Sequence, residues 1–248
     1  MTNKGTHSYI EDSRNESIFI YVDGQIVPRS EAKISVFDSG FLLGDGVWEG
    51  IRLHNGHLCF QEEHTNRLFE GAKALQIGIG KSSSELVDII YETLDANRMK
   101  SDVHIRLIIS RGLKRTPYQH PNANVGGPTI VVIPEYKKTD LSMIENGIRL
   151  CTVETIRGPQ NVQDPRLNTL SKLNCIVACL EADAKGYDEG IMLDKNGYVS
   201  TCNSTNFFIV RNGELWTSTG KYCLPGVTRG NIIKLCQENN IPIFEKNF

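Results

Sequence analysis

The stretch FDSGFLLGDGVWEGIRLHNGHLCFQEEHTNRLFEGAKAL, residues 37–75, decides how this chain folds. Within it, IRLHNGHLCF carries Asn55-Gly56, a pair that favours the tight turn of a β-hairpin. The following segment, HTNRLFEGAKAL, repeats Leu68, Ala72 and Leu75 at the spacing of one helix face. The stretch therefore predicts a β-hairpin followed by an amphipathic helix.

Similar signals lie on both sides of this stretch. IFIYVDGQIV, residues 18–27, predicts two short strands that turn at Asp23-Gly24. SSSELVDIIYETLDANRM, residues 82–99, predicts a second helix whose serines can cap its start. HIRLIISRG (104–112) and TIVVIP (129–134) read as strands, and the segment between them is rich in turn-forming residues.

The second half repeats the mixture of hairpins and helices. Asn196-Gly197 and Asn212-Gly213 predict the turns of two hairpins, over residues 189–201 and 206–218. A strand is expected at 147–155 and a helix at 171–186, closed by Gly186. A last helix is expected at 228–240, with Thr228 as a candidate N-cap.

These elements predict an α+β protein with two halves. We expect a flexible N-terminus over residues 1–17, a small domain over 18–134, a linker over 135–140 and a large domain over 141–248. Clefts between two such halves are common ligand sites.

Composition narrows the class of protein. The net charge of −2 gives no reason to expect binding to nucleic acid or to an anionic membrane, and no apolar run approaches membrane-spanning length. The seven cysteines form no C-x-x-C pair, and neither they nor the histidines show metal-ligand spacing, so we expect no metal site. Reduced thiols and a polar N-terminus without a secretory pattern favour a cytoplasmic protein.

Residues 37–75 resemble the N-terminal signature of the class IV pyridoxal-phosphate enzymes, close to the branched-chain and D-amino acid aminotransferases. GYDEGIMLDKNGYVSTCNSTNFFIVRNGELWTS (186–218) and CLPGVTRGNIIKL (223–235) resemble the C-terminal half of the same family, in the same order. The resemblance implies the two-domain fold type IV, with pyridoxal 5'-phosphate as cofactor. Familiar members continue beyond the point that corresponds to Phe248, so we expect the usual C-terminal segment to be lacking, in a fragment or in a natural short form.

The family attaches its cofactor to a lysine through a Schiff base. Matching SKLN to the family segment gives Lys172 this catalytic role. With that match, the stretch from Lys172 to Asp188 is about one helical turn shorter than in familiar members. A gapless match through LEADAKGYDEG places Asn168 at the lysine position instead, and in that case the chain has no Schiff-base residue. Both matches remain open.

The resemblance also implies residues that hold the cofactor phosphate. It assigns Arg67 to the guanidinium that contacts the phosphate, a role that suits the paired donors of arginine. Val227 and Thr228 match residues whose backbone amides and hydroxyl contact the phosphate, and a helix that starts there offers free N–H groups. Leu224 matches the apolar residue that packs against the ring.

The pyridine nitrogen is where this sequence departs from the family. Members usually carry a glutamate where Thr201 stands here, and that carboxylate keeps the ring nitrogen protonated. The neutral hydroxyl of Thr201 can share one hydrogen bond. We therefore expect Thr201 to contact the cofactor and to make the ring a weaker electron sink.

The loop after residue 112 corresponds to the family's contact with the substrate carboxylate. Gapless counting places Thr116 and Tyr118 at positions that carry arginine and histidine in D-amino acid aminotransferases. Lys114 and Arg115 lie close in sequence and are the candidate cations. Phe41 is a candidate wall of the side-chain pocket.

Together these residues predict an aminotransferase that moves an amino group between an amino acid and a 2-keto acid. A lyase of the aminodeoxychorismate lyase type and a non-enzymatic relative with a disabled site are the alternatives. By resemblance we expect a homodimer, with small-molecule substrates and no nucleic acid or membrane partner.

Overall fold

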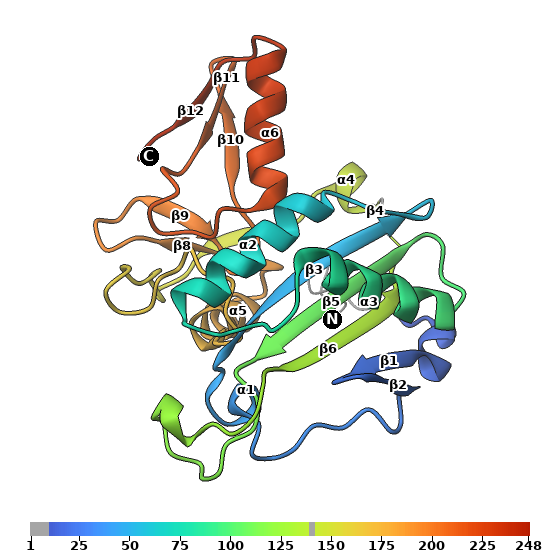
Figure 1. The fold of residues 1–248 in the computed structure, drawn as a ribbon. Helices are drawn as coiled ribbons and strands as arrows, with labels where there is room; N and C mark the ends of the chain where they lie inside the picture. Colours follow the sequence, from blue (N-terminus) through green and yellow to red (C-terminus); the bar gives the residue numbers. More distant parts are fainter. Residues whose placement is uncertain (1–9, 139–141) are drawn as a thin grey trace. The chain divides into compact units, whose positions relative to one another are not determined.

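A computed structural model describes residues 10–138 and 142–248, which fall into two compact units. The N-terminal unit comprises residues 10–138 and 168–171, and the C-terminal unit comprises 142–167 and 172–248. Figure 1 labels the helices and strands of both units. Among the described residues, no helix combines the length and the apolar character that a membrane crossing requires.

The N-terminal unit is built on a six-stranded antiparallel sheet in the order β2-β1-β6-β5-β3-β4. The longest pairing joins β3 and β5, in register from Gly46 with Ser110 to Leu53 with Val103. Asn55 and Gly56 turn β3 into β4 with positive φ angles, which confirms the predicted hairpin. The strands are β1 (Phe19–Val22), β2 (Gln25–Pro28), β3 (Gly46–His54), β4 (His57–Leu58), β5 (Val103–Ser110) and β6 (Thr129–Tyr136).

Two helices, α2 (Gln61–Ala74) and α3 (Ser83–Ala96), cover one face of this sheet (Figure 1). Leu68 of α2 and Ile90 of α3 pack with Ile51, Ile105 and Leu107 of the strands, and all five are almost fully buried. Alternation along β3 places Val47, Glu49, Ile51 and Leu53 on this same buried side. A carboxylate therefore shares a strand face with the apolar core.

Local capping explains where the helices begin. Ser82 and Glu85 form a reciprocal capping box at the start of α3, as the serine-rich sequence predicted. Asp38 caps the short helix α1 (Ser39–Leu43), which the sequence analysis did not anticipate. Two 3-10 helices complete the unit, η1 (Ser13–Ser17) and η2 (Pro121–Ala123).

The start of the described chain is bonded to the sheet of the N-terminal unit. Residues 10–17 belong to the N-terminal unit, whereas residues 1–9 and part of the expected linker, 139–140, lie outside the described residues. Asn15 is 5% exposed, donates to the carbonyl of Tyr136 at 3.0 Å and accepts from its backbone N–H at 2.8 Å. This paired hydrogen bond attaches η1 to the end of β6.

The C-terminal unit contains two three-stranded sheets, β7-β8-β9 and β10-β11-β12. Gly197 and Asn212-Gly213 adopt positive φ angles at the two predicted hairpin turns. The third strand of the second sheet pairs parallel to β11 and was not predicted, since three residues carry no readable alternation. The strands are β7 (Leu150–Thr152), β8 (Glu189–Leu193), β9 (Val199–Cys202), β10 (Phe208–Arg211), β11 (Glu214–Thr217) and β12 (Ile243–Glu245).

Three helices belong to this unit: α4 (Ser142–Asn146), α5 (Leu173–Ala184) and α6 (Val227–Glu238). Helix α5 lies close against β8 because Gly190 has no side chain, and a Cβ there would stand 3.0 Å from the carbonyl oxygen of Ala178. The small apolar cluster at this contact holds Val153, Ala178, Ala182 and Met192.

Residues 168–171 return the chain to the N-terminal unit for four residues. The backbone N–H of Trp48 donates to the carbonyl of Asn168 at 3.0 Å, and that of Leu170 donates to Gly46 at 2.9 Å. Gly46 must be glycine here, since a Cβ would stand 2.6 Å from the backbone carbonyl oxygen of Ile109 and equally close to Leu170 Cδ1. The segment thus runs beside β3 immediately before Lys172.

Candidate cofactor site

The start of α6 has the features of an anion site. Its N-cap is Gly226 rather than Thr228, so Thr228 lies in the first turn, and within the described residues no side chain caps this end. The first N–H groups of a helix have no intrahelical acceptor and lie at the positive end of the dipole. A Cβ at Gly226 would stand 2.1 Å from Asn206 Oδ1, so only glycine fits this entry.

Thr201 belongs to the same unit as the start of α6. It lies on β9, is 7% exposed, and its hydroxyl donates to the carbonyl of Thr205 at 2.7 Å. The next residue, Asn206, donates to the carbonyl of Leu224 at 3.0 Å, just before α6. Because its proton is already donated, the Thr201 oxygen can only accept a further hydrogen bond. Thr201 can therefore bond to the ring nitrogen of the cofactor only when that nitrogen is protonated and donates.

Lys172 is the N-cap residue of α5, with φ −114° and ψ 12°, and it is half-buried. Helix α5 packs on β8 at Gly190, and β8 pairs with β9, where Met192 lies opposite Thr201. The candidate lysine, the candidate ring contact and the start of α6 are therefore carried by connected elements of one unit.

Asn168, the alternative residue for the lysine position, lies in the N-terminal unit and is 5% exposed. Its amide donates to the carbonyl of Trp48 at 2.6 Å, and the indole of Trp48 donates to the carbonyl of Thr169 at 3.1 Å. In the structure Asn168 therefore helps to attach residues 168–171 to β3.

Arg67 is anchored in the N-terminal unit by a buried carboxylate. Its Nε donates to Glu49 Oε1 at 2.8 Å and its Nη2 to Glu49 Oε2 at 2.6 Å. His64 Nδ1 stands 2.7 Å from the same Oε2. Burial acts to raise the pKa of Glu49, but the hydrogen bonds from His64 and Arg67 outweigh it and hold that pKa below its usual range.

The remaining cofactor candidate, Leu224, is half-buried beside Pro225 and the start of α6. Val227 is half-buried and Thr228 is exposed, so the first turn of α6 is accessible in this unit.

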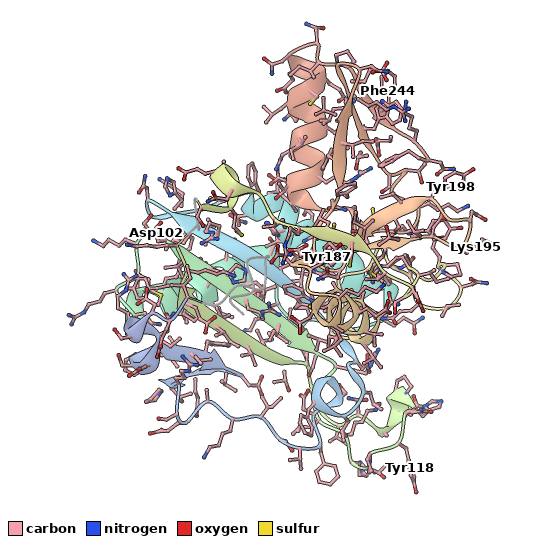
Figure 2. The ribbon with its side chains drawn as sticks, turned by 180° about the vertical axis from the view of Figure 1, so that it is seen from behind. Asp102, Tyr118, Tyr187, Lys195, Tyr198 and Phe244 are labelled. Carbon is pink, nitrogen blue, oxygen red and sulfur yellow. The ribbon has the colours of Figure 1, made fainter. Side chains whose placement is uncertain are left out.

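The substrate candidates occupy different environments. Lys114 is only 3% exposed, and its amine donates to Asn124 Oδ1 at 2.9 Å, which ties the loop after β5 to itself. Arg115 is exposed and Phe41 is 66% exposed on α1. Tyr118 lies on the same loop as Lys114 and is 72% exposed (Figure 2). Of the two candidate cations, Arg115 is the accessible one.

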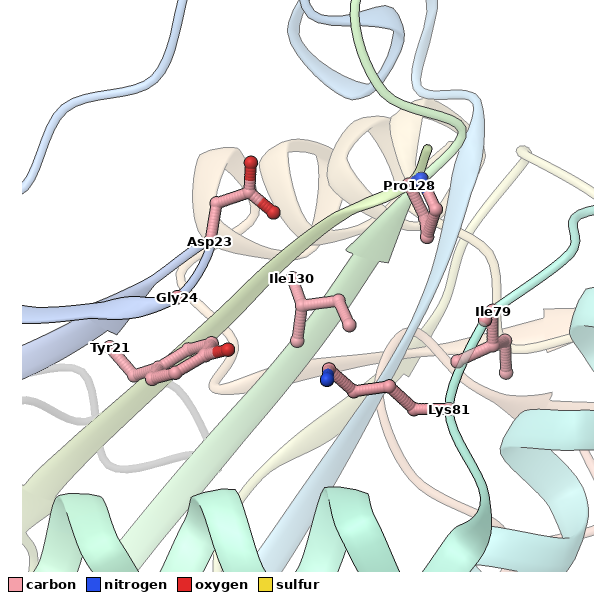
Figure 3. A pocket seen from close by; sticks show the side chains of 8 residues that line it. Tyr21, Asp23, Gly24, Ile79, Lys81, Pro128 and Ile130 are labelled. Atoms are coloured by element: carbon pink, nitrogen blue, oxygen red, sulfur yellow. The ribbon is translucent and has the colours of Figure 1, made fainter. Parts of the chain in front are cut away.

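A shallow pocket elsewhere in the N-terminal unit contains none of these residues. Tyr21 of β1, Ile130 of β6 and Lys81 lie around it, together with the Asp23-Gly24 turn (Figure 3). The close-up shows the hydroxyl of Tyr21 and the amine of Lys81 directed toward the same space.

The partners of Arg67 were not predicted from the sequence. Glu49 lies eighteen residues before Arg67, on a strand rather than on the helix, and His64 had been considered only as a metal ligand. Strand alternation was the available signal, since it places Glu49 in phase with the buried Val47 and Ile51.

The donor set fits a phosphorylated pyridine cofactor. An uncapped helix start at Val227 and Thr228 suits a phosphate, a half-buried amine is present at Lys172, and the Thr201 oxygen can accept from a ring N–H. The lack of a carboxylate at position 201 leaves the ring nitrogen without a counter-charge there.

Comparison with known proteins identifies the family. The pattern described as amino-transferase class IV matches residues 46–248. Branched-chain-amino-acid aminotransferase-like protein 1 of Arabidopsis thaliana is 39% identical over 232 residues, which are 94% of this chain and 42% of that protein. The chain thus spans about two fifths of the length of this relative.

Shorter relatives are covered more fully. A D-alanine aminotransferase of Staphylococcus aureus is 30% identical over 230 residues, 92% of this chain and 79% of that protein. The structure of the T.th. branched-chain amino acid aminotransferase with pyridoxamine 5'-phosphate superposes with a TM-score of 0.83 at 27% identity, covering 93% of this chain and 77% of that one. The resemblance and the fold type IV architecture are confirmed: the chain belongs to the class IV amino-transferase family.

Proposed function

We propose that this chain uses pyridoxal 5'-phosphate to transfer an amino group between an amino acid and a 2-keto acid. Membership of the class IV family supports the proposal, as does the relative solved with pyridoxamine 5'-phosphate. The observation that carries it is the arrangement of the C-terminal unit. Helix α5, which follows Lys172, packs on β8, and β8 pairs with β9, which carries Thr201; a hydrogen bond from Asn206 to Leu224 then links the segment after β9 to the start of α6.

The bound cofactor supplies a ring that withdraws electrons and a carbon that accepts and passes on an amino group. In the proposed arrangement, the backbone amides of Val227 and Thr228, the Thr228 hydroxyl and the Arg67 guanidinium bind its phosphate. Leu224 packs against the ring. Thr201 accepts one hydrogen bond from the protonated ring nitrogen, because its own proton is held by Thr205.

Lys172 has two tasks in this proposal. Its Nζ would hold the cofactor covalently, a bond that the neutral amine forms. With the cofactor and an amino acid bound, the same Nζ would accept the proton from the α-carbon of the substrate and would later donate it again.

We assign substrate binding to the loop after β5 and to α1. The exposed Arg115 is the candidate for the substrate carboxylate, and Lys114 holds the shape of the loop through Asn124. Phe41, largely exposed in the structure, is the candidate wall for an apolar substrate side chain.

We also propose a homodimer in the cytoplasm. Helix α5 carries Leu173, Ile176 and Leu180 at helical spacing, and these side chains are 70%, 52% and 62% exposed. They form an apolar stripe that a second copy of the chain would cover in a dimer. The seven cysteines form no disulfide in the structure, which fits a reducing compartment. Sedimentation of the purified chain tests the first point.

Product analysis tests the reaction. The purified protein is incubated with pyridoxal 5'-phosphate, a 15N-labelled amino acid and an unlabelled 2-keto acid, and 15N in the new amino acid is measured. We expect label transfer only when the keto acid is present. Conversion of one substrate without any acceptor would support the lyase instead, and absence of any conversion would contradict amino-group transfer.

A further inference from the structure

Tyr21 of β1 is buried, but its hydroxyl has no hydrogen-bond partner among the described residues. The residue is 7% exposed and lies opposite Ile26 of β2 and Val132 of β6 in the sheet. The hydroxyl of a buried tyrosine usually forms a hydrogen bond, because an unsatisfied polar group destabilises the fold. The position of this hydroxyl therefore suits a partner that comes from solution.

The Tyr21 hydroxyl and the Lys81 amine are directed toward the same shallow pocket of the N-terminal unit (Figure 3). Lys81 is half-buried, just before α3, and within the described part of the chain it forms neither a hydrogen bond nor an ion pair. Glu85, the acid in the first turn of α3, instead accepts from the backbone N–H and the hydroxyl of Ser82, at 2.7 and 2.8 Å. Two hydrogen-bond donors, one of them charged, therefore face one space.

The other side chains that line this pocket are mainly apolar. Ile79 and Ile130 are 6% and 4% exposed and belong to the apolar core, and Pro128 completes this part of the lining. The turn at Asp23-Gly24 lies on the opposite side, and the backbone N–H of Asp23 donates to the carbonyl of Ile130 at 2.8 Å. The volume of about 320 Å³ is at the lower end for small-molecule sites. The pocket therefore suits a small ligand that has an apolar body and one acidic group.

We propose that this pocket is a further binding site, which takes a small aliphatic monocarboxylate. The carboxylate accepts hydrogen bonds from the Tyr21 hydroxyl and the Lys81 amine, a pair of donors of which one is charged. The aliphatic chain lies on Ile79 and Ile130. Asp23 also lines the pocket, and its negative charge disfavours a second acidic group on the ligand. The pocket contains no residue assigned above to the cofactor or the substrate, so the site goes beyond the proposed function.

The experiment measures the binding of isovalerate, a branched five-carbon acid, to the full chain by equilibrium dialysis. Isovaleramide has the same apolar body without the charge, and glutarate has a second acidic group. We expect isovalerate to bind about tenfold more tightly than either, because only isovalerate combines one carboxylate with an apolar body. In NMR of the chain with 13C-labelled tyrosine rings, the Tyr21 signal, identified by its absence from Tyr21→Phe, should shift as isovalerate is added.

Two substitutions each remove one donor. Tyr21→Phe and Lys81→Met should each lower the affinity for isovalerate by about tenfold, since each variant loses one hydrogen bond to a charged group. The melting temperature of Tyr21→Phe should not fall, because the deleted hydroxyl bonds to no described residue. Tyr91→Phe, on α3, and Lys100→Met, at an exposed site of the same unit, are the matched controls and should keep the original affinity.

Arg115→Ala separates this pocket from the proposed substrate site and should leave the binding of isovalerate unchanged. Loss of binding in Arg115→Ala but not in Lys81→Met overturns the proposal and instead supports isovalerate binding at the proposed substrate site. Unchanged affinity in Tyr21→Phe or in Lys81→Met also overturns it, as does equal binding of isovaleramide or glutarate. An original chain that does not bind isovalerate, or a Tyr21 signal that does not shift, overturns it too.

Discussion

The two units bury apolar and polar side chains in different proportions. The N-terminal unit has an apolar core that extends from β1 through β3, β5 and β6 to α2 and α3. In the C-terminal unit the corresponding cluster among described residues holds four small or flexible members. Among the described residues of this unit, buried polar side chains such as Glu189, Ser200, Thr201, Asn203 and Arg229 are as numerous as buried hydrophobic ones, whereas hydrophobic ones predominate in the N-terminal unit.

The contrast distinguishes the unit whose apolar core stabilises the fold from the unit that carries most of the proposed binding residues. An apolar core holds one arrangement through packing, whereas buried polar groups need specific partners and can also bind a ligand. Asn203 is an example of a buried polar group with a specific partner. Its side-chain oxygen accepts a hydrogen bond from the backbone N–H of Gly190 on β8 at 2.7 Å. Most candidate cofactor residues lie in the polar unit, and the exception, Arg67, is bonded to a buried carboxylate that faces the apolar core.

The contrast is tested most strongly at Lys172. Lys172→Ala should lower turnover by about a thousandfold or more, because the covalent attachment and the proton acceptor are lost together. The melting temperature should change little, since the side chain is only half-buried. Lys185→Ala, at the other end of α5, is the matched control and should retain turnover. Full activity of Lys172→Ala would remove this residue from the mechanism.

The apolar side of the contrast is tested at Leu107. Leu107→Ala opens a cavity at a fully buried position and should lower the free energy of unfolding by about 4 kcal/mol. Met192→Ala, equally buried but in the small cluster, should cost about 2 kcal/mol. Denaturant titration measures both. Equal losses would show that the two cores contribute equally to the free energy of unfolding.

His104 of β5 makes the N-terminal unit sensitive to acid. Burial, with a smaller contribution from Lys137, Arg106 and Arg52, lowers the pKa of His104 to about 4 from 6.5. The unfolded chain then binds the proton first, so stability is complete above pH 6.5 and is lost as pH falls toward 4. The loss should reach about 3 kcal/mol at most. His104→Gln should flatten this dependence, whereas His57→Gln, at an exposed site, should retain it.

The smallest effect is expected at a helix end. Ser82→Ala removes the hydroxyl of the capping box and should cost about 1 kcal/mol, because the N–H of Glu85 loses its acceptor. Ser83→Ala, in the first turn of the same helix, is the control. Equal melting temperatures for the two variants would show that the cap is not needed once α3 is packed.

Local chemistry made part of this fold predictable. The Asn-Gly and Asp-Gly pairs mark tight turns because their residues tolerate positive φ, and the structure has them at Asn55, Asn212 and Asp23. Helices α2 and α3 follow from apolar spacing and from Ser82.

Long-range partners were not predictable in the same way. The parallel pairing of β12 with β11, the return of residues 168–171 to β3, and the bond between Glu49 and Arg67 each join segments whose separation leaves no periodic trace in the sequence. The sequence predicted which residues belong to the candidate site. It did not predict that Arg67 bonds to Glu49 or that the Thr201 hydroxyl donates to Thr205, and both bonds are seen only in the structure.

The central claim is that Lys172 carries the cofactor, and direct mapping tests it. The full chain is incubated with pyridoxal 5'-phosphate, reduced with borohydride, digested and analysed by mass spectrometry. The account predicts the phosphopyridoxyl mass on the peptide that contains Lys172. Absence of that mass, or its presence only on another lysine, would contradict the account.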